Sequence, residues 1–271
     1  MPDTAAFISA DCPVPMRFTV APGLFWLSAT LYLGQEKGDR LLCLILFPRR
    51  GVSSVMPRIP RGQIGGHVYH ALNRGNGGAT VFYKDGDYRA FLDLLADAKA
   101  RYPIKILGFC LMPNHFHLVL QPSTPDALSS FMQWWLTSHV RRYHQHYHGH
   151  GHVWQGRFKS FPIQQDAHLL TVLRYVLHNP VRAGLAPHTQ DWPWSSLRHP
   201  TLINPSPVEM PENWNQWLEE PLFDQELSTL RTCVHRQAPF GAPEWVERLA
   251  KVLGLESTLR PRGRPRIPER K

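Results

Sequence analysis

Apolar residues recur with a regular period only from Gly66 onward. Alternation with a period of two predicts strands, and apolar residues spaced three and four apart predict amphipathic helices. Short runs rich in Gly, Asn and Pro separate these segments, as loops do. In chain order the predicted elements are a strand at 67–72, a helix from Asp85 or Asp87 to about 100, strands at 104–112 and 115–121, a helix from Asp126 past Leu136, a strand at 158–163, and a helix from Asp166 to about 178.

The element order β-α-β-β-α-β-α predicts a ferredoxin-like α+β fold, with an antiparallel sheet and helices on one face of it. We assign this domain to residues 56–200. Residues 201–259 form a wrapping and helical segment in this prediction, with two short helices between 222 and 255. A basic tail follows at 260–271.

The first 55 residues differ from the rest of the chain. Their apolar stretches lie among Pro and Gly without a sustained period. We therefore expect a poorly ordered extension at 1–55, with Met56 as the true start of the protein.

The charge of the chain suits a polyanionic partner. The formal net charge is +9, and residues 260–271 hold six bases against one acid. Arg262 and Arg264 lie in an Arg-Gly-Arg-Pro run that looks like an AT-hook, an arm that enters the minor groove of DNA. The alternative is a basic tail that binds phosphates without preference for sequence.

Neither membrane insertion nor secretion is expected. Residues 18–35 carry no charge, but their densest apolar part is short for a membrane span. The four cysteines are scattered without a CxxC pair, which argues against a zinc ribbon or a disulfide framework. A cytoplasmic, nucleoid-associated protein is the simplest interpretation.

Candidate chemistry begins in the segment from Pro113 to Val119. In a strand, His115 and His117 share one face, and Phe116 points the other way into the core. Two neighbouring imidazoles are a ready pair of metal ligands. A His-x-His pattern alone is also found on ordinary half-exposed strands, so it needs support from elsewhere in the chain.

The helix that begins at Asp166 provides this support. Its apolar residues cluster in one stripe, and Tyr175 falls on the opposite side at about 100° per residue. We therefore expect Tyr175 to be exposed, as a nucleophile must be. Asn179 lies one turn further on, where its amide oxygen could be a third ligand to a divalent ion held by His115 and His117. Such an ion would polarise a phosphate for attack by Tyr175.

At these residues the chain resembles the HUH-type single-tyrosine transposases, and most closely the REP-associated tyrosine transposases. The resemblance runs from about Gly66 to Arg266 and leaves out the first 55 residues. The segments that carry it are His67–His70 with Asn73–Asn76, Met112–Val119, His152–Phe158, Arg174-Tyr175, Asn179–Leu185 and Trp194–Ser196.

The resemblance implies a ferredoxin-like fold and a DNA transposase and endonuclease that cuts and rejoins single-stranded DNA at hairpins formed by palindromic repeats. It implies Mg²⁺ or Mn²⁺ as cofactor, Tyr175 as nucleophile, and His115, His117 and Asn179 around the metal. The DNA-binding residues that we expect are Arg74, Asn76, Arg157, Arg182, Arg262 and Arg264. For the loop that holds Arg74 and Asn76, an ordinary glycine-rich turn is an equal alternative.

Two other classes of function remain open. One is a DNA-binding protein that recognises hairpins without cutting them, and the other is a zinc hydrolase built on His115 and His117. An intact Tyr175 disfavours the first, and the lack of a carboxylate placed as a base near the histidines disfavours the second. The sequence leaves monomer and homodimer equally open.

Overall fold

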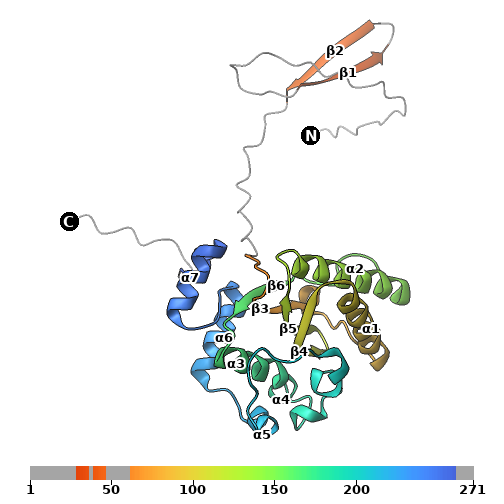
Figure 1. Cartoon of the computed structure of the whole chain (residues 1–271). Helices are drawn as coiled ribbons and strands as arrows, with labels where there is room; N and C mark the ends of the chain where they lie inside the picture. Colours follow the sequence, from red (N-terminus) through yellow and green to blue (C-terminus); the bar gives the residue numbers. More distant parts are fainter. Residues whose placement is uncertain (1–28, 37–38, 47–61, 261–271) are drawn as a thin grey trace, which may run out of the picture. The chain divides into compact units, whose positions relative to one another are not determined.

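The computed structural model describes residues 29–36, 39–46 and 62–260 (Figure 1). Strands β1 (Ala29–Glu36) and β2 (Asp39–Leu46) form an antiparallel pair in a unit separate from the main domain. We had expected no regular element here. A strand pair needs only main-chain hydrogen bonds between neighbouring segments, so it forms without the alternation that marks a half-buried strand. The rest of 1–55, Met56, Arg262 and Arg264 lie outside the described residues.

The main domain is built on a four-stranded antiparallel sheet. Its strands are β3 (Val68–Arg74), β4 (Ile104–Met112), β5 (His115–Pro122) and β6 (Lys159–Ile163). They lie in the order β4-β5-β3-β6, and every pair is antiparallel. The predicted α+β plan with an antiparallel sheet is confirmed, and β4 has the predicted bounds.

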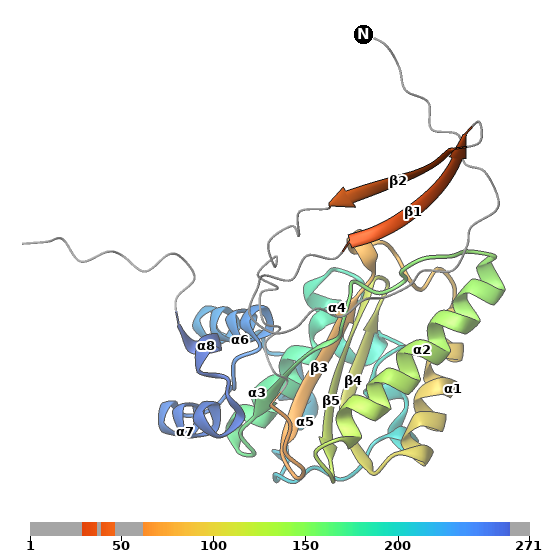
Figure 2. The ribbon, with the colours of Figure 1, turned by 90° about the horizontal axis from the view of Figure 1, so that it is seen from above.

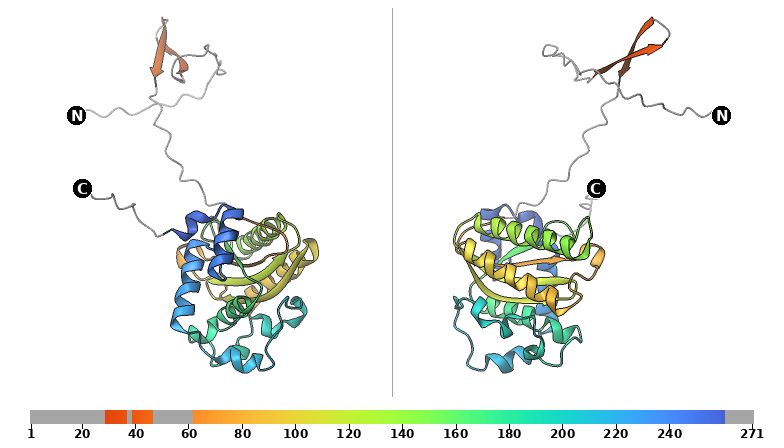
Figure 3. Two further views of the ribbon diagram at one scale, coloured as in Figure 1. Left: turned by 60° about the vertical axis from the view of Figure 1, so that its left-hand side comes forward. Right: turned by 90° about the vertical axis from the view of Figure 1, so that its right-hand side faces the viewer.

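The helices cover both faces of the sheet, which corrects the expectation of one covered face. Helices α1 (Asp85–Arg101) and α2 (Ala127–Tyr147) pack on one face, and α3 (Ala167–Leu177) packs on the other. Figure 2 shows the strands between these two layers, and Figure 3 shows α1 and α2 side by side. Strands β4 and β5 are buried on both faces, so their apolar runs do not indicate which face a helix covers.

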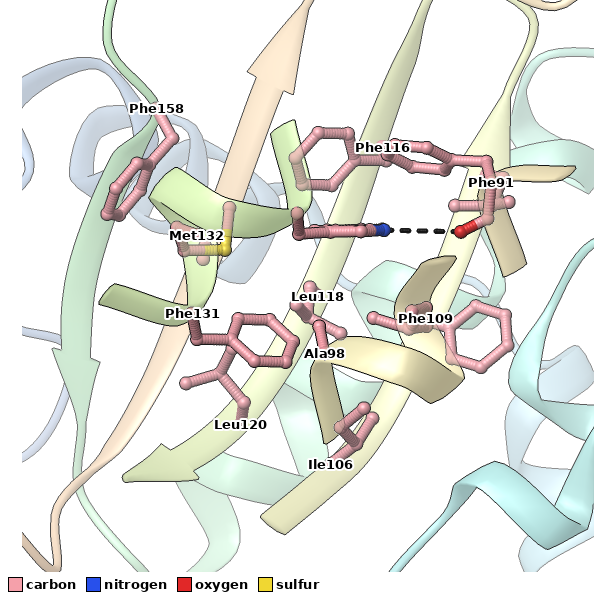
Figure 4. Packing of buried hydrophobic residues seen from close by; sticks show 14 of the residues in the cluster. Phe91, Ala98, Ile106, Phe109, Phe116, Leu118, Leu120, Phe131, Met132 and Phe158 are labelled. Atoms are coloured by element: carbon pink, nitrogen blue, oxygen red, sulfur yellow. Dashed lines mark hydrogen bonds between the residues drawn. The ribbon is translucent and has the colours of Figure 1, made fainter. Parts of the chain in front are cut away.

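The face under α1 and α2 holds a dry aromatic core. Phe116 of β5 lies 5.6 Å from Phe91 of α1 and 4.9 Å from Trp135 of α2, measured between ring centroids. All three side chains are fully buried. The indole Nε1 of Trp135 donates to the Phe91 carbonyl, which satisfies the polar atom of this side chain within the core (Figure 4).

Two aspartates were predicted to cap the starts of α2 and α3, and only one of them does. Asp166 caps α3, because its carboxylate accepts from the main-chain N–H of His168 at 2.8 Å. Asp126 stands directly before α2 as predicted, but its side chain makes no capping hydrogen bond. Its backbone is already helical there, whereas a capping side chain normally needs an extended backbone.

The chain after α3 wraps the second face. Two short helices lie in the predicted range between 222 and 255, and several further turns precede them. No helix among the described residues is both long and apolar enough to cross a membrane. The remaining helices are α4 (Asn179–Arg182), α5 (Trp214–Glu219), α6 (Asp224–Arg236), α7 (Pro243–Leu253) and α8 (Glu256–Leu259), with 3-10 turns η1 (Asn76–Gly78), η2 (Thr189–Asp191), η3 (Ser196–Arg198) and η4 (Pro200–Leu202).

Candidate active site

The two predicted histidines lie on the sheet face that α3 covers. His115 pairs across the strands with Arg74, and His117 pairs with Leu72. Residues directly opposite each other in an antiparallel pair share a face, so all four side chains stand on the α3 side. Phe116 points into the opposite core, as the alternation predicted. The ring centroids of His115 and His117 are 5.1 Å apart.

Tyr175 of α3 lies against these histidines. Its ring centroid is 5.7 Å from that of His117, and the two rings meet edge to face. The structure thus brings the predicted nucleophile beside the predicted ligand pair. The expectation that Tyr175 is exposed is wrong, because only 6% of its surface is accessible.

The Tyr175 ring is buried against His70 and His117 of the sheet and under the Arg182 guanidinium, and a second layer covers the neighbouring part of α3. Arg174, the neighbour of Tyr175, is itself 4% exposed. Its guanidinium lies 3.2 Å from the Glu226 carboxylate of α6 and 4.0 Å from the ring centroid of Trp217 in α5. The sheet and the C-terminal segment therefore enclose α3 from more than one side. Helical arithmetic assumes that only the apolar stripe is buried, so it placed Tyr175 toward solvent.

Asn179 and Arg182 complete the region beside Tyr175. The Asn179 amide nitrogen donates to the Tyr175 carbonyl at 3.0 Å, and its oxygen accepts from the Arg182 guanidinium. The same guanidinium lies over the Tyr175 ring, 4.6 Å from its centroid. Asn179 is therefore close to Tyr175 as predicted, with its oxygen already hydrogen-bonded to a cation. Its role as a metal ligand stays a prediction.

Two polar partners of the histidines were missed in the sequence. The Nε2 atom of His70 lies 2.8 Å from Nδ1 of His117, and both residues are buried. The Nδ1 atom of His115 lies 2.7 Å from the Asn114 side-chain oxygen. His70 stands two residues before Leu72 on the same strand, so alternation alone would have placed it on this face.

Burial keeps the histidines of the site neutral. Removal from water lowers the pKa of His70 to about 3 and that of His115 to about 4, and it holds the pKa of His117 well below 6.5. The positive charges of Arg74 and Arg182 lower the pKa of His115 further. Neutral imidazole is the form that can offer a lone pair to a metal ion.

Four of the six predicted DNA-binding residues lie at the end of the sheet that carries His115. Arg74 ends β3, and its carbonyl accepts from the Gln155 N–H at 2.7 Å. The Asn76 N–H donates to the Val153 carbonyl at 2.9 Å, which joins the 74–78 turn to the loop that contains Arg157. Arg74, Asn76, Arg157 and Arg182 are all exposed. The structure thus gives this end of the sheet an exposed cationic rim.

Metal-binding side chains are few at this site. Among the described residues, no group of three or more His, Cys, Asp or Glu side chains is arranged to hold a metal ion. Any ion held by His115 and His117 would therefore need other oxygen ligands, such as an amide, water or a substrate phosphate.

The central part of the chain is similar to known proteins. Residues 64–179 match the family model described as "Transposase IS200 like". A Haemophilus influenzae protein described as a REP-associated tyrosine transposase is 29% identical over 124 residues, which are 42% of this chain and 68% of that protein. The Escherichia coli K12 REP-associated tyrosine transposase is 22% identical over 122 residues, which are 45% of this chain and 72% of the relative. One solved structure, of a REP-associated tyrosine transposase bound to a REP hairpin, covers 60% of this chain and 96% of its own, with 18% identity and a TM-score of 0.43.

Proposed function

Because residues 64–179 match the model of the IS200-like transposase family, we propose that this chain cleaves and rejoins single-stranded DNA at hairpins, with Tyr175 as the nucleophile. The observation that carries the proposal is the position of the Tyr175 ring, 5.7 Å from His117 and under the Arg182 guanidinium. A phenol, two neutral imidazoles and a cation on one sheet face are the groups that phosphodiester cleavage needs.

The proposed cleavage step is a balanced substitution at phosphorus. The Tyr175 oxygen forms a bond to the phosphorus as the bond to the 3′ oxygen breaks. The phenol loses its proton and the departing 3′ oxygen gains one, which leaves a 5′-phosphotyrosine and a free 3′ hydroxyl. The reverse reaction with a 3′ hydroxyl rejoins DNA without an outside source of energy, because one phosphodiester replaces another.

The donor atoms at the site fit a divalent cation, proposed as Mg²⁺ or Mn²⁺. The hydrogen bond of His115 to Asn114 engages Nδ1 and leaves Nε2 for an ion. In His117 the Nδ1 atom is also engaged, by His70. When bound, the ion would polarise a non-bridging phosphate oxygen and offset its charge. Asn179 is the proposed third ligand, and the positive charge of Arg182 next to its oxygen would oppose a cation there unless Arg182 turned to another acceptor.

A DNA phosphate is the acceptor that we propose for Arg182. Its side chain is exposed and lies between solvent and the Tyr175 ring that it stacks on. Arg74, Asn76 and Arg157 would hold the strand along the same end of the sheet, mainly through phosphate contacts. Such contacts position DNA without reading its sequence, so they say nothing of which hairpin is preferred.

The test is formation of a covalent protein–DNA adduct. Purified protein is mixed with single-stranded hairpin oligonucleotides and Mg²⁺ or Mn²⁺, and a denaturing gel is used to look for a slower band. We expect an adduct that Tyr175→Phe abolishes, with a loss on the order of 10⁴-fold or more in rate, because the variant retains the ring but lacks the attacking oxygen.

The controls separate this proposal from its alternatives. Tyr175→Phe should bind the hairpin as wild type does, because the phosphate contacts come from other residues. Tight hairpin binding without any adduct in wild type would favour the non-cutting DNA-binding protein. A zinc-dependent hydrolysis that survives Tyr175→Phe would favour the hydrolase.

A further inference from the structure

The Nδ1 atoms of both proposed metal-binding histidines point to side-chain partners. For His115 the partner is Asn114, and its amide has a fixed orientation because its nitrogen donates to the Gly78 carbonyl at 3.0 Å. The oxygen of that amide therefore faces His115, and an oxygen can only accept. His115 must carry its proton on Nδ1, which leaves the Nε2 lone pair for an ion.

The partner of His117 is another histidine, which allows two arrangements. If His117 donates from Nδ1 to Nε2 of His70, its own Nε2 keeps a lone pair. If His70 donates instead, Nε2 of His117 carries the proton and cannot bind a metal. Only the first arrangement makes His117 equivalent to His115, with both Nε2 atoms ready as ligands.

We propose that His70 is a positioning residue for the metal site, which accepts the Nδ1 proton of His117 and fixes its ring with Nε2 toward the ion. The inference rests on the proposed function, in which His117 is a ligand. Partners of this kind are common in metal sites, where the second ring nitrogen of a ligating histidine donates to a neighbouring acceptor.

The surroundings of His70 argue against a purely structural role. Its side chain is fully buried, with the Phe161 ring 5.0 Å away between centroids. Its Nδ1 atom is buried and has no hydrogen-bond partner. A buried polar atom without a partner costs about 1–3 kcal/mol of stability. An apolar side chain would avoid that cost but would leave Nδ1 of His117 without a partner, so what histidine provides at this position is the hydrogen bond to His117.

Two substitutions of His70 distinguish its role as a hydrogen-bond acceptor from its role in filling the buried space. His70→Leu fills the site but cannot accept a hydrogen bond, whereas His70→Gln retains an acceptor oxygen. We expect His70→Leu to bind Mn²⁺ about 10- to 100-fold more weakly by calorimetry, the range found when such partners are removed. His70→Gln should recover much of the loss. The matched control is His139→Leu, because His139 is also buried with an unpartnered Nδ1 but lies on α2 beside Phe91.

A second readout needs no metal. Long-range ¹H–¹⁵N NMR correlations of the metal-free protein assign the proton of each neutral histidine to Nδ1 or Nε2. We expect Nδ1–H in both His115 and His117, with loss of this preference at His117 in His70→Leu and no change at His115. A proton on Nε2 of His117 in wild type would overturn the proposal, and so would unchanged Mn²⁺ affinity in His70→Leu.

Failure of the proposed function gives a different pattern. If wild type binds no Mn²⁺, or binds it equally well after His115→Ala, the metal site itself is wrong, and the His70 inference then fails as well. If His115→Ala loses Mn²⁺ while His70→Leu keeps it, only the role of His70 is wrong. Thermal unfolding of each variant, checked against His139→Leu, shows whether a lower affinity reflects lost folding.

Discussion

The two faces of the sheet use the same strands for different purposes. In β5, Phe116 packs between Phe91 and Trp135, while His115 and His117 face α3. The first face is mainly apolar and aromatic, and the indole N–H of Trp135 donates within it. The second face holds buried imidazoles at a cost in stability, next to a tyrosine and an arginine. In β5, therefore, one residue packs in the core while its two neighbours belong to the candidate site.

The two faces can also be compared by what their buried groups contribute to the free energy of unfolding. A fully apolar face gains from every buried carbon, about 25 cal/mol for each Å² removed from water. Both faces give up part of that gain. Nδ1 of His70 and Nε of Arg174 are buried without partners on the α3 side, and Nδ1 of His139 and Nε1 of Trp154 are buried without partners on the aromatic side. What sets the α3 face apart is that its imidazoles lie next to one another and to Tyr175.

Two neighbouring residues should respond in opposite ways, and this is the largest effect that we expect. Phe116→Ala removes a fully buried ring and should lower the free energy of unfolding by about 3–5 kcal/mol. His115→Ala, at a half-exposed position, should change it by less than about 1 kcal/mol. Urea unfolding measures both. Adduct formation should disappear in His115→Ala, whereas the folded fraction of Phe116→Ala should retain it.

Two results at His115 would contradict the assignment of one face to the core and the other to the chemistry. A large loss of stability in His115→Ala, or an adduct yield unaffected by this change, would mean that His115 supports the fold and not the chemistry.

A buried histidine on the aromatic face should make stability depend on pH. Burial lowers the pKa of His139 to about 4, against 6.5 in its ordinary state. The unfolded chain then binds more protons than the folded one between these values, so stability falls as the pH falls through this window. From about pH 7.5 to about pH 5, this group alone should account for about 2 kcal/mol.

Urea unfolding of wild type and His139→Leu at the two pH values checks this prediction. The variant should lose about 2 kcal/mol less than wild type on acidification. It should still lose some stability, because the pKa values of His70, His115 and His117 are lowered as well. Equal losses in the two proteins would show that His139 titrates normally.

The smallest effect is expected at Arg182, on the exposed edge of the α3 face. Arg182→Ala should weaken hairpin binding several-fold and reduce the slope of log affinity against log salt by about one, as the loss of one phosphate contact does. Fluorescence anisotropy across a salt series measures both. Lys105→Ala is a matched control, because Lys105 is exposed at the end of β4 next to Ile104, at the opposite end of the strand from Met112. The same change in both variants would indicate a general effect of charge.

The sequence predicted most of the fold because its elements have strong local signals. Ile104–Met112 is an apolar strand apart from Lys105, and Asp166 caps α3 as expected. The placement of the helices on both faces was missed, because strands buried on both sides carry no alternation to read. The strand pair β1–β2 was missed because its segment has no sustained period.

The sequence predicted which residues come together at the candidate site, but it did not predict their burial or their hydrogen-bond partners. The alternation rule placed His115 and His117 on one face and Phe116 on the other, and the structure confirms this. The burial of Tyr175 depends on contacts with His70 and His117 of the sheet, which lie more than fifty residues earlier in the chain, and on Arg182, which covers its ring. The His70–His117 hydrogen bond likewise joins residues from two strands. Local patterns carry no information on such distant partners.

The most direct test of the account is to identify the residue that becomes attached to DNA. Trypsin cuts after Arg174 and Arg182, so Tyr175 lies in a peptide that spans 175–182 and contains no other tyrosine. After adduct formation and nuclease digestion, mass spectrometry should find a nucleotide joined through its 5′ phosphate to Tyr175 in this peptide. A nucleotide on any other peptide, or on a residue of this peptide other than Tyr175, would contradict the assignment of Tyr175 as the nucleophile.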